Sequence, residues 1–483
     1  MLYEPKHVAL CMDEAERKIA LEFSEGYKEF LNVAKTERES AAYAVKVAEA
    51  AGYKPYTWGQ ALKAGDKVYY LNRNKSVILA VIGTEDIAAG VNIMAAHIDT
   101  CRLDLKQNPL YEQSEIAYFK THYYGGIKKY QWVAIPLSLH GVVILSNGEK
   151  HEICIGEDEN DPVLYVTDLL PHLAQDQMKR AANEIIKGEE LNLLVGSLPL
   201  EGESDKAVKK QVLKLLNDKY GWCEKDFLSA ELEAVPALKA KDVGLDRSMI
   251  GAYGHDDRVC SYTALQAMLE LENPTRTAIL VLADKEEIGS MGNTGLESAY
   301  MRYFIEDISE TLGAKPRVVF SNSQCLSADV NSAYDPTFPD VFEAANSSFM
   351  NRGVVITKFT GARGKSGSSD ANAEFIAGLH SKLDKNNVVW QTGELGRVDL
   401  GGGGTVAAYI ANLNVDVVDV GVPVLSMHAP YEVVSKMDVY MTYKAFKVKL
   451  SIIVRRIFPS PAPRNNTPWG RIMPIRPVES SRL

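Results

Sequence analysis

The 483-residue sequence contains few cysteines, and no two of them form a Cys-x-x-Cys pair. This spacing argues against a closed zinc site built from cysteines, and it offers no disulfide framework. We therefore expect reduced thiols and a cytoplasmic protein. The six scattered cysteines are Cys11, Cys101, Cys154, Cys223, Cys260 and Cys325.

Long apolar runs and an excess of basic residues are also missing. No stretch of about 18 consecutive apolar residues occurs, so we expect no membrane-spanning helix. Charges interrupt the only apolar stretch near the N-terminus, and no signal peptide is visible there. The formal net charge of −10 argues against a nucleic-acid-binding surface. The sequence thus predicts neither a nucleic acid nor a membrane as a partner.

Hydrophobic residues make up 46% of the chain, and its length is sufficient for at least two hydrophobic cores. Unbroken apolar runs that alternate with helical patterns are typical of a parallel sheet covered on both faces. We therefore predict an α/β fold with a mixed, mostly parallel sheet between helices. The predicted helices cover residues 13–51 and begin again at Asp256, and the predicted strands cover residues 77–82, 91–96, 278–283, 318–320 and 415–425.

The sequence between residues 101 and 242 has a different character. Asn147-Gly148 separates two apolar runs, which predicts a β-hairpin with a tight turn, and a lysine-rich helix is expected over residues 205–220. We interpret residues 101–242 as an inserted β-rich domain that interrupts a catalytic domain made of residues 1–100 and 243–458. Residues 459–483 contain six prolines without periodicity, so we expect a disordered tail.

Histidine and acidic side chains occur where the predicted strands end or helices begin. The carboxyl ends of parallel strands form one rim of a sheet, so these side chains are expected to converge there. Two imidazoles with several carboxylates suit zinc, cobalt or manganese, and the set lacks the thiolates of a structural zinc site. The side chains concerned are His97, Asp99, Asp256, Glu286, Glu287, Asp329 and His428.

Such a donor set predicts metal-assisted hydrolysis. Two ions that share a bridging carboxylate can together activate a water molecule and polarise a peptide carbonyl. A further carboxylate must take the proton of the water and pass it to the leaving amine. The neighbours Glu286 and Glu287 meet this need, because one can bind metal while the other stays free. Asp99 could accept the second imidazole N–H of His97 and fix its tautomer.

Each of these motifs also has a purely structural interpretation. Asp256 could cap a helix, Asp329 could belong to a turn, and His428 could be a core histidine. Glu-Glu pairs such as Glu286-Glu287 are common on solvated surfaces. The joint pattern, and not any single motif, therefore supports the metal-site interpretation.

In the order of its motifs, the sequence resembles the aspartyl aminopeptidase family of two-metal zinc exopeptidases. The order and rough spacing hold from about residue 5 to residue 457. The resemblance implies a zinc-exopeptidase-like fold and a metal-dependent aminopeptidase, with a preference for Asp or Glu at the peptide N-terminus as a narrower expectation. The matching segments are residues 95–100 (AAHIDT), 254–258 (GHDDR), 284–290 (DKEEIGS), 327–329 (SAD), 401–405 (GGGGT) and 426–430 (SMHAP).

The resemblance also assigns a role to each predicted metal ligand. It implies that Asp256 bridges two divalent ions, most simply zinc. His97 and Asp329 would complete one site, and Glu287 and His428 would complete the other.

Other roles implied by the resemblance concern catalysis, substrate and assembly. Glu286 would be the general base and Asp99 the partner of His97. His172 matches a histidine that reaches the active site of a neighbouring subunit, and Lys358 roughly matches a lysine that would pair with an acidic substrate side chain. The inserted domain would mediate dimerisation, and dimers would assemble into a dodecamer that admits peptides.

Several alternatives remain open at this point. Residues 361–366 resemble a phosphate loop, but they lack the spacing that such a loop requires. The glycine run at residues 401–404 is interpreted as a close approach of the backbone to the metal site or to a substrate amine. A related two-metal amidohydrolase or deacylase, or a neutral-residue aminopeptidase, would have the same ligands. An inactive shell or scaffold protein would have no need to keep Glu286 beside every ligand.

Overall fold

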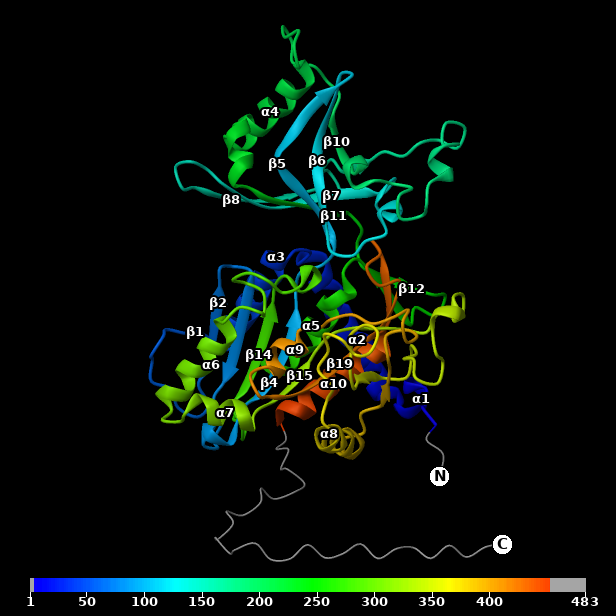
Figure 1. Ribbon diagram of the computed structural model, residues 1–483. Coiled ribbons are helices and arrows are strands. Elements are labelled where there is room, and N and C mark those ends of the chain that lie inside the picture. The colour runs from blue at the N-terminus through cyan, green and yellow to red at the C-terminus, as the bar shows by residue number, and fades with distance from the viewer. Residues whose placement is uncertain (1–3, 452–483) are drawn as a thin grey trace, which may run out of the picture.

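A computed structural model describes residues 4–451, and the tail predicted to be disordered, residues 459–483, lies outside the described residues. The molecule has a larger part built on a nine-stranded sheet and a smaller part built on a seven-stranded sheet, which lies above it in Figure 1. Among residues 4–451, no helix combines the length and the apolar character needed to cross a bilayer.

The nine-stranded sheet forms the centre of the larger part. Its order is β1-β2-β3-β14-β4-β15-β19-β17-β18. The four central strands β14, β4, β15 and β19 run parallel, whereas β3 and β17 are antiparallel to their central neighbours. This is the mixed, mostly parallel sheet predicted from the sequence. The strands are β1 (Lys54–Pro55), β2 (Lys67–Asn72), β3 (Ser76–Val81), β4 (Asn92–His97), β14 (Ala278–Ala283), β15 (Gln324–Ser327), β17 (Val354–Thr357), β18 (Trp390–Thr392) and β19 (Asp416–Gly421).

Helices cover both faces of this sheet. Side chains along β3 alternate between the layers, because Leu79 packs into the core on one face and Ile78 into the core on the other, as expected for a strand buried on both sides. The first layer comprises α1 (Val8–Cys11), α2 (Glu14–Val33), α3 (Glu37–Ala50), α5 (His255–Leu269), α8 (Ala373–Lys385) and α10 (Lys436–Ser451). The second layer comprises α6 (Tyr300–Thr311), α7 (Pro316–Asn322) and α9 (Ala407–Ala411).

Three predicted elements differ from the structure. The helix predicted over residues 13–51 is two helices, because Thr36 caps α3 and exchanges hydrogen bonds with Glu39 in a capping box. The strand predicted over residues 318–320 is wrong. Those residues lie in α7, which Pro316 starts, and an apolar run this short does not distinguish helix from strand.

The third difference concerns residues 415–425, which form two strands in different sheets. After β19 the chain leaves the nine-stranded sheet and continues as β20 in a five-stranded sheet of order β12-β13-β21-β20-β16. Because β21 pairs with both β13 and β20, this small sheet brings the start of α5 close to the segment after β20. Its strands are β12 (Lys241–Val243), β13 (Met249–Ala252), β16 (Asn331–Ser332), β20 (Pro423–Leu425) and β21 (Glu432–Ser435).

The smaller part is an inserted antiparallel barrel with its own hydrophobic core. Its order is β11-β5-β6-β10-β9-β7-β8, and an additional pairing of β11 with β7 closes it. The predicted hairpin is confirmed, since β7 and β8 pair around the Asn147-Gly148 turn. Its elements are β5 (Arg102–Gln113), β6 (Ile116–Tyr124), β7 (Pro136–Ile144), β8 (Lys150–Ile155), β9 (Leu164–Val166), β10 (Asn192–Gly196), α4 (Ala207–Tyr220) and β11 (Glu231–Pro236).

Short 3-10 helices connect several of these elements. Three of them, η1 (Ile87–Ala89), η6 (Glu286–Ile288) and η7 (Pro339–Val341), lie in the larger part. The others are η2 (Lys129–Trp132), η3 (Gln177–Lys179), η4 (Gly188–Glu190) and η5 (Glu224–Ser229).

Candidate metal centre

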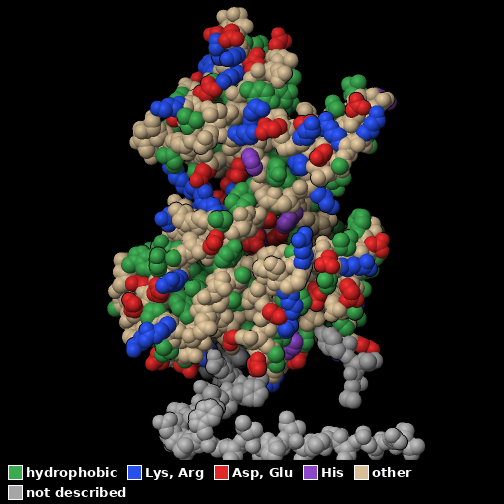
Figure 2. Space-filling model, in the orientation of Figure 1, with side chains coloured by type: hydrophobic (Ala, Val, Ile, Leu, Met, Phe, Trp, Pro, Cys, Tyr) green, Lys and Arg blue, Asp and Glu red, His purple; other side chains and the backbone are tan. Residues whose placement is uncertain are grey.

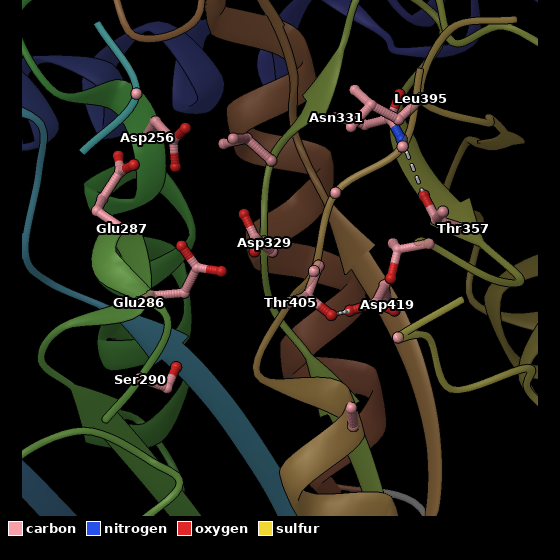
Figure 3. A pocket seen from close by; sticks show the side chains of 18 of the residues that line it. Asp256, Glu286, Glu287, Ser290, Asp329, Asn331, Thr357, Leu395, Thr405 and Asp419 are labelled. Carbon is pink, nitrogen blue, oxygen red and sulfur yellow. Dashed lines mark hydrogen bonds between the residues drawn. The ribbon is translucent and has the colours of Figure 1, made fainter. Parts of the chain in front are cut away.

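Seven of the predicted site residues meet at one edge of the nine-stranded sheet. His97 ends β4, η6 with its two glutamates follows β14, and Asp329 lies two residues after β15. Figure 3 shows Asp256, Glu286, Glu287 and Asp329 directed toward a common space. The carboxyl ends of the parallel strands thus gather side chains that are far apart in the sequence, as the sheet topology predicts.

Asp256 lies between the two histidines. Its Oδ1 is 3.1 Å from Nε2 of His97, and its Oδ2 is 3.1 Å from Nε2 of His428. Asp256 is in the first turn of α5, and its own main-chain oxygen accepts a hydrogen bond from Thr100 at 3.0 Å. Each oxygen of this carboxylate therefore faces a different imidazole, which is the arrangement that a ligand shared by two ions requires.

Two further carboxylates stand beside the two histidines. Asp329 Oδ1 is 4.0 Å from Nε2 of His97, and Glu287 Oε2 is 3.5 Å from Nε2 of His428. Donor atoms of His97, Asp256 and Asp329 all lie within 4.8 Å of one another. The residues separate into a group around His97 and a group around His428, with Asp256 between them.

Glu286 approaches the same space without belonging to either group. Its Oε2 is 3.8 Å from Nε2 of His97. Burial, together with repulsion from the neighbouring Glu287 carboxylate, raises the pKa of Glu286 to about 8. A carboxyl group with a raised pKa in such a site can exchange protons near neutral pH.

Asp99 is fully buried and fixes several groups at once. Its carboxylate accepts hydrogen bonds from the backbone N–H of Glu286 at 3.1 Å and of Glu287 at 3.2 Å, and Tyr124 donates to it at 2.9 Å. Its Oδ1 is 3.3 Å from Nδ1 of His97, while its main-chain oxygen is closer to that nitrogen, at 3.0 Å. Asp99 therefore connects His97 to η6.

The sequence analysis missed Glu432, a buried residue in β21. Glu432 Oε2 accepts a hydrogen bond from the backbone N–H of Asp256 at 3.0 Å, and Oε1 accepts one from the backbone N–H of His428 at 2.6 Å. One carboxylate thus holds the backbones of two predicted ligands. Its position four residues after His428 was the available signal, but only the pairing of β21 with β13 reveals the contact with Asp256.

Cys101 was also missed as a member of the site. Its sulfur lies within 4.8 Å of donor atoms of Glu287 and His428, and burial raises the pKa of the thiol to about 12. Gly125 packs against it with a φ of +76°, and a Cβ at that position would come within 2.5 Å of the sulfur. Glycine is required there because a side chain has no room.

The electrostatics of the cluster fit bound cations. Burial and repulsion from Asp256 raise the pKa of Glu287 to about 7, and burial with repulsion from Asp257 raises that of Asp329. Glu287 Oε1 is buried and has no hydrogen-bond partner among the described residues. The mixed imidazole and carboxylate donors are those of catalytic zinc sites, so the residues present fit divalent metal ions.

A cavity of about 630 Å³ opens onto these side chains. It lies beside the hollow between the two parts of the molecule, where Figure 2 shows a histidine and acidic side chains. Gly402, Gly403 and Gly404 line the cavity, and Gly402 has a φ of +106° with its Cα against the backbone of Gly361. On the wall, Thr405 donates to Asp419 at 2.8 Å and Asn331 to Thr357 at 3.0 Å (Figure 3).

Two predicted substrate-binding residues are not brought to the centre. His172 is exposed in the loop between β9 and η3, and it does not line the cavity. Lys358 is half exposed and pairs with Asp370, whose Oδ1 is 2.9 Å from the lysine Nζ. Lys358 directly follows β17, and of the two neighbours only Thr357, the last residue of the strand, lines the cavity.

Comparison with known proteins shows which family has this architecture. The family profile described as "Aminopeptidase I zinc metalloprotease (M18)" matches residues 30–448. The chain belongs to the M18 family of zinc aminopeptidases. It is therefore a metalloaminopeptidase that removes N-terminal residues from peptides, and the expected resemblance to the aspartyl aminopeptidase family is confirmed.

Relatives within the M18 family match nearly the whole chain. A probable M18 family aminopeptidase 1 from Clostridium acetobutylicum is 48% identical, with 92% of this chain and 98% of the relative covered. One from Thermotoga maritima is 45% identical, with 88% and 94% covered.

Solved structures agree with these relatives. The crystal structure of an M18 aminopeptidase from Thermotoga maritima matches with a TM-score of 0.89 at 42% identity, covering 93% of this chain and all of that chain. The crystal structure of aminopeptidase I from Clostridium acetobutylicum matches with a TM-score of 0.87 at 45% identity, with the same coverage. The predicted fold class is thereby confirmed, including the inserted β-rich domain, which is an antiparallel barrel.

Proposed function

We propose that the seven clustered side chains form a two-metal catalytic centre for this aminopeptidase. The observation that supports it most is the position of Asp256, with one carboxylate oxygen 3.1 Å from each histidine. In this proposal Asp256 bridges the ions, His97 and Asp329 complete one site, and Glu287 and His428 complete the other. Zinc suits these ligands and is the metal of the family, while cobalt and manganese would also fit.

Catalysis then depends on how the chain's own groups move a proton. Two bound metal ions would lower the pKa of a water molecule and polarise the first peptide carbonyl. We assign to Glu286 the role of accepting the proton of that water and delivering it to the leaving amine nitrogen. Its backbone N–H is held by Asp99, which keeps the glutamate in place while its carboxyl group changes protonation state.

A second proposal concerns the residue that is removed. Selection of Asp or Glu requires a cationic side chain near the substrate, and Lys358 was the candidate. In the described part of the chain no lysine or arginine lines the cavity, and Lys358 is paired with Asp370 outside it. The wall around Thr357 and Asn331 has a carboxylate, Asp419, and no cation, so it offers no partner for an acidic side chain and favours the alternative, an aminopeptidase that prefers neutral N-terminal residues.

The assembly and the location of the protein also belong to this proposal. We infer a homo-oligomer, with residues 101–242 mediating dimerisation and dimers combining into a dodecamer. The yeast mApe1 dodecamer shares the fold at 19% identity. Exposed Leu169, Leu170 and Leu173 surround His172, and apolar groups clustered on a surface favour contact with another subunit.

A cytoplasmic location agrees with six unpaired cysteines.

A panel of substrates with and without chelator tests the activity and the selectivity together. Asp-, Glu-, Leu- and Lys-anilides and an N-acetylated leucine derivative would be compared before and after treatment with phenanthroline, and again after zinc is restored. We expect zinc-dependent hydrolysis that is fastest for the neutral residue. Activity that persists in chelator contradicts the metal centre, faster turnover of Asp contradicts neutral selectivity, and faster turnover of the acetylated substrate indicates a deacylase.

A further inference from the structure

A second group of mixed metal-binding side chains lies where the two parts of the molecule meet. Glu39 is in α3 of the larger part, His140 is in β7 and Cys154 is in β8 of the inserted barrel. One donor atom from each residue lies within 4.8 Å of the others. Figure 1 shows α3 on the side of the larger part that faces the barrel. This cluster is therefore composed of residues from both parts.

The Glu39 carboxylate is already oriented by the start of its helix. Its Oε2 accepts hydrogen bonds from the backbone N–H of Lys35 at 2.9 Å and of Thr36 at 3.1 Å. The other oxygen, Oε1, is 2.7 Å from Nδ1 of His140. The capping interaction thus leaves one oxygen directed at the histidine.

The second ring nitrogen of His140 faces acceptors. Nε2 lies 3.1 Å from the hydroxyl oxygen of Ser138 and 3.3 Å from Oε1 of Glu157. The imidazole is buried, with 2% of its surface exposed. Donation of the Nε2 proton to these groups leaves the Nδ1 lone pair for the space shared with Glu39 and Cys154. Histidines that bind metal are usually held in this way by a carboxylate behind them.

Cys154 supplies a third type of donor and access from solvent. It pairs directly across from His140 in the register of β7 and β8, and it is exposed. Cys154 and Glu39 both line a cavity of about 270 Å³, which provides an entry path for an ion and room for a water molecule.

We propose that Glu39, His140 and Cys154 bind a divalent metal ion of the zinc type at this junction. Nitrogen, oxygen and sulfur donors together suit zinc, and a water from the cavity would complete a tetrahedral site. This site shares no residue with the catalytic centre. An ion bound here ties α3 to the β7–β8 hairpin and so fixes the barrel against the larger part.

The exchange of protons for the ion is balanced in charge. Glu39 and Glu157 favour the protonated imidazole, so that without metal a proton lies between Glu39 and His140. Binding of one divalent ion releases this proton and the thiol proton of Cys154. Two positive charges leave and two arrive, and the net charge of the junction is unchanged.

Metal counting on the purified holoenzyme tests this site. Wild type, Cys154→Ser and Cys223→Ser would be compared, since Cys223 is another exposed cysteine of the barrel region. We expect wild type and Cys223→Ser to carry one more equivalent of zinc than Cys154→Ser, with equal aminopeptidase activity in all three. Equal zinc content in wild type and Cys154→Ser would overturn the proposal.

Replacing zinc by cobalt provides a spectroscopic test of metal binding by Cys154. A purely structural role of these three residues would not produce the expected absorption band. Thiolate bound to cobalt gives a near-ultraviolet charge-transfer band, which we expect in wild type, Cys223→Ser and Cys101→Ser but not in Cys154→Ser. The Cys101 variant controls for the thiol beside the catalytic centre. Glu39→Gln should weaken cobalt binding by at least about tenfold. A proton-only contact between Glu39 and His140 predicts no band in wild type, and that result would also refute the site.

Discussion

The catalytic edge and the junction between the two parts are both clusters of histidine and carboxylate side chains, and their charges are compensated differently. At the catalytic edge, burial and mutual repulsion raise the pKa of Glu286 to about 8 and that of Glu287 to about 7. At the junction, burial alone would raise the pKa of Glu157, but a hydrogen bond from His140 and the charge of Lys35 lower it. Even without the proposed ion, the junction has Lys35 and His140 to compensate its buried acid, whereas the buried acids of the catalytic edge depend on bound metal ions.

This difference in charge compensation indicates that the catalytic edge serves function and the junction serves stability. Buried acids with raised pKa values that share a cavity are typical of reactive sites. Buried acids that are matched by lysine and histidine hold parts of a structure together, and removing one partner leaves an uncompensated charge. Substitutions at the catalytic edge should therefore change turnover or metal binding, and substitutions at the junction should change the free energy of unfolding.

The largest effect is expected for Glu286→Gln. The amide cannot accept the proton of the attacking water, so turnover should fall by about 10² to 10⁴-fold. The predicted ligands are untouched, and the metal content should stay at the wild-type value. Steady-state kinetics and metal counting on one preparation measure both quantities.

The matched control is Glu272→Gln, a substitution of an exposed glutamate after α5, which should leave both quantities unchanged. Near-normal turnover of Glu286→Gln would refute its role as the general base. A loss of metal equal to the loss of turnover would instead make Glu286 a ligand.

A smaller effect on metal binding is expected for Glu432→Gln. The amide can accept from only one of the two backbone N–H groups, of Asp256 and His428, that the carboxylate now holds. Loss of such outer support typically weakens metal binding by about 10- to 100-fold. Competition with a chromophoric chelator measures this change, with the exposed Glu374→Gln as control. Unchanged metal affinity would mean that Glu432 does not position these ligands.

At the junction, Lys35→Met should affect stability and not turnover. Lys35 Nζ is 2.6 Å from Glu157 Oε1 and donates to the main-chain oxygen of Pro236 at 2.7 Å. Removing one partner of a buried pair reduces the free energy of unfolding by about 3–5 kcal/mol. The control Lys46→Met, on the exposed side of α3, should change it by less than about 0.5 kcal/mol. Denaturant unfolding that gives similar values for both variants would contradict this account of the junction.

The smallest effect is expected for Lys358→Met. The lysine is exposed and paired with Asp370 outside the cavity, and such surface pairs contribute at most about 1 kcal/mol to stability. The ratio of kcat/KM for Asp- and Leu-anilides should equal that of wild type. A selective loss of Asp hydrolysis would restore Lys358 as the partner of an acidic substrate.

The residues at strand ends were the part of the site that could be predicted from the sequence. His97 ends an apolar run that was predicted as a strand, and parallel strands bring their carboxyl ends to one edge. Asp329 was placed by the run at residues 318–320, which lies in α7, and the strand that positions it, β15, was not predicted. Glu432 could not be found in this way, because its contact with Asp256 depends on the register of two short antiparallel strands. The position of Lys358 was equally inaccessible, because it depends on the loop after β17, where the lysine pairs with Asp370 outside the cavity.

The secondary structure, like the site, could be predicted from the sequence only in part. Long apolar strands such as β14 were predicted with the bounds that the structure has, because six buried residues in a row leave few alternatives. The three-residue apolar run in α7 was wrongly predicted to be a strand. Three apolar residues are compatible with the repeat of a helix and with that of a strand, and it is Pro316, at the start of the helix, that identifies the segment as helical. The division of residues 13–51 depends on the capping box of Thr36 and Glu39, a local signal that the apolar pattern does not contain.

The most direct test of the catalytic centre is a crystal structure of the zinc-loaded protein with anomalous data collected at the zinc edge. Two strong peaks about 3.5–4 Å apart are expected, one on each side of the Asp256 carboxylate. The first should contact His97 and Asp329, and the second Glu287 and His428. A single peak, or two peaks that Asp256 does not share, would contradict the two-metal centre.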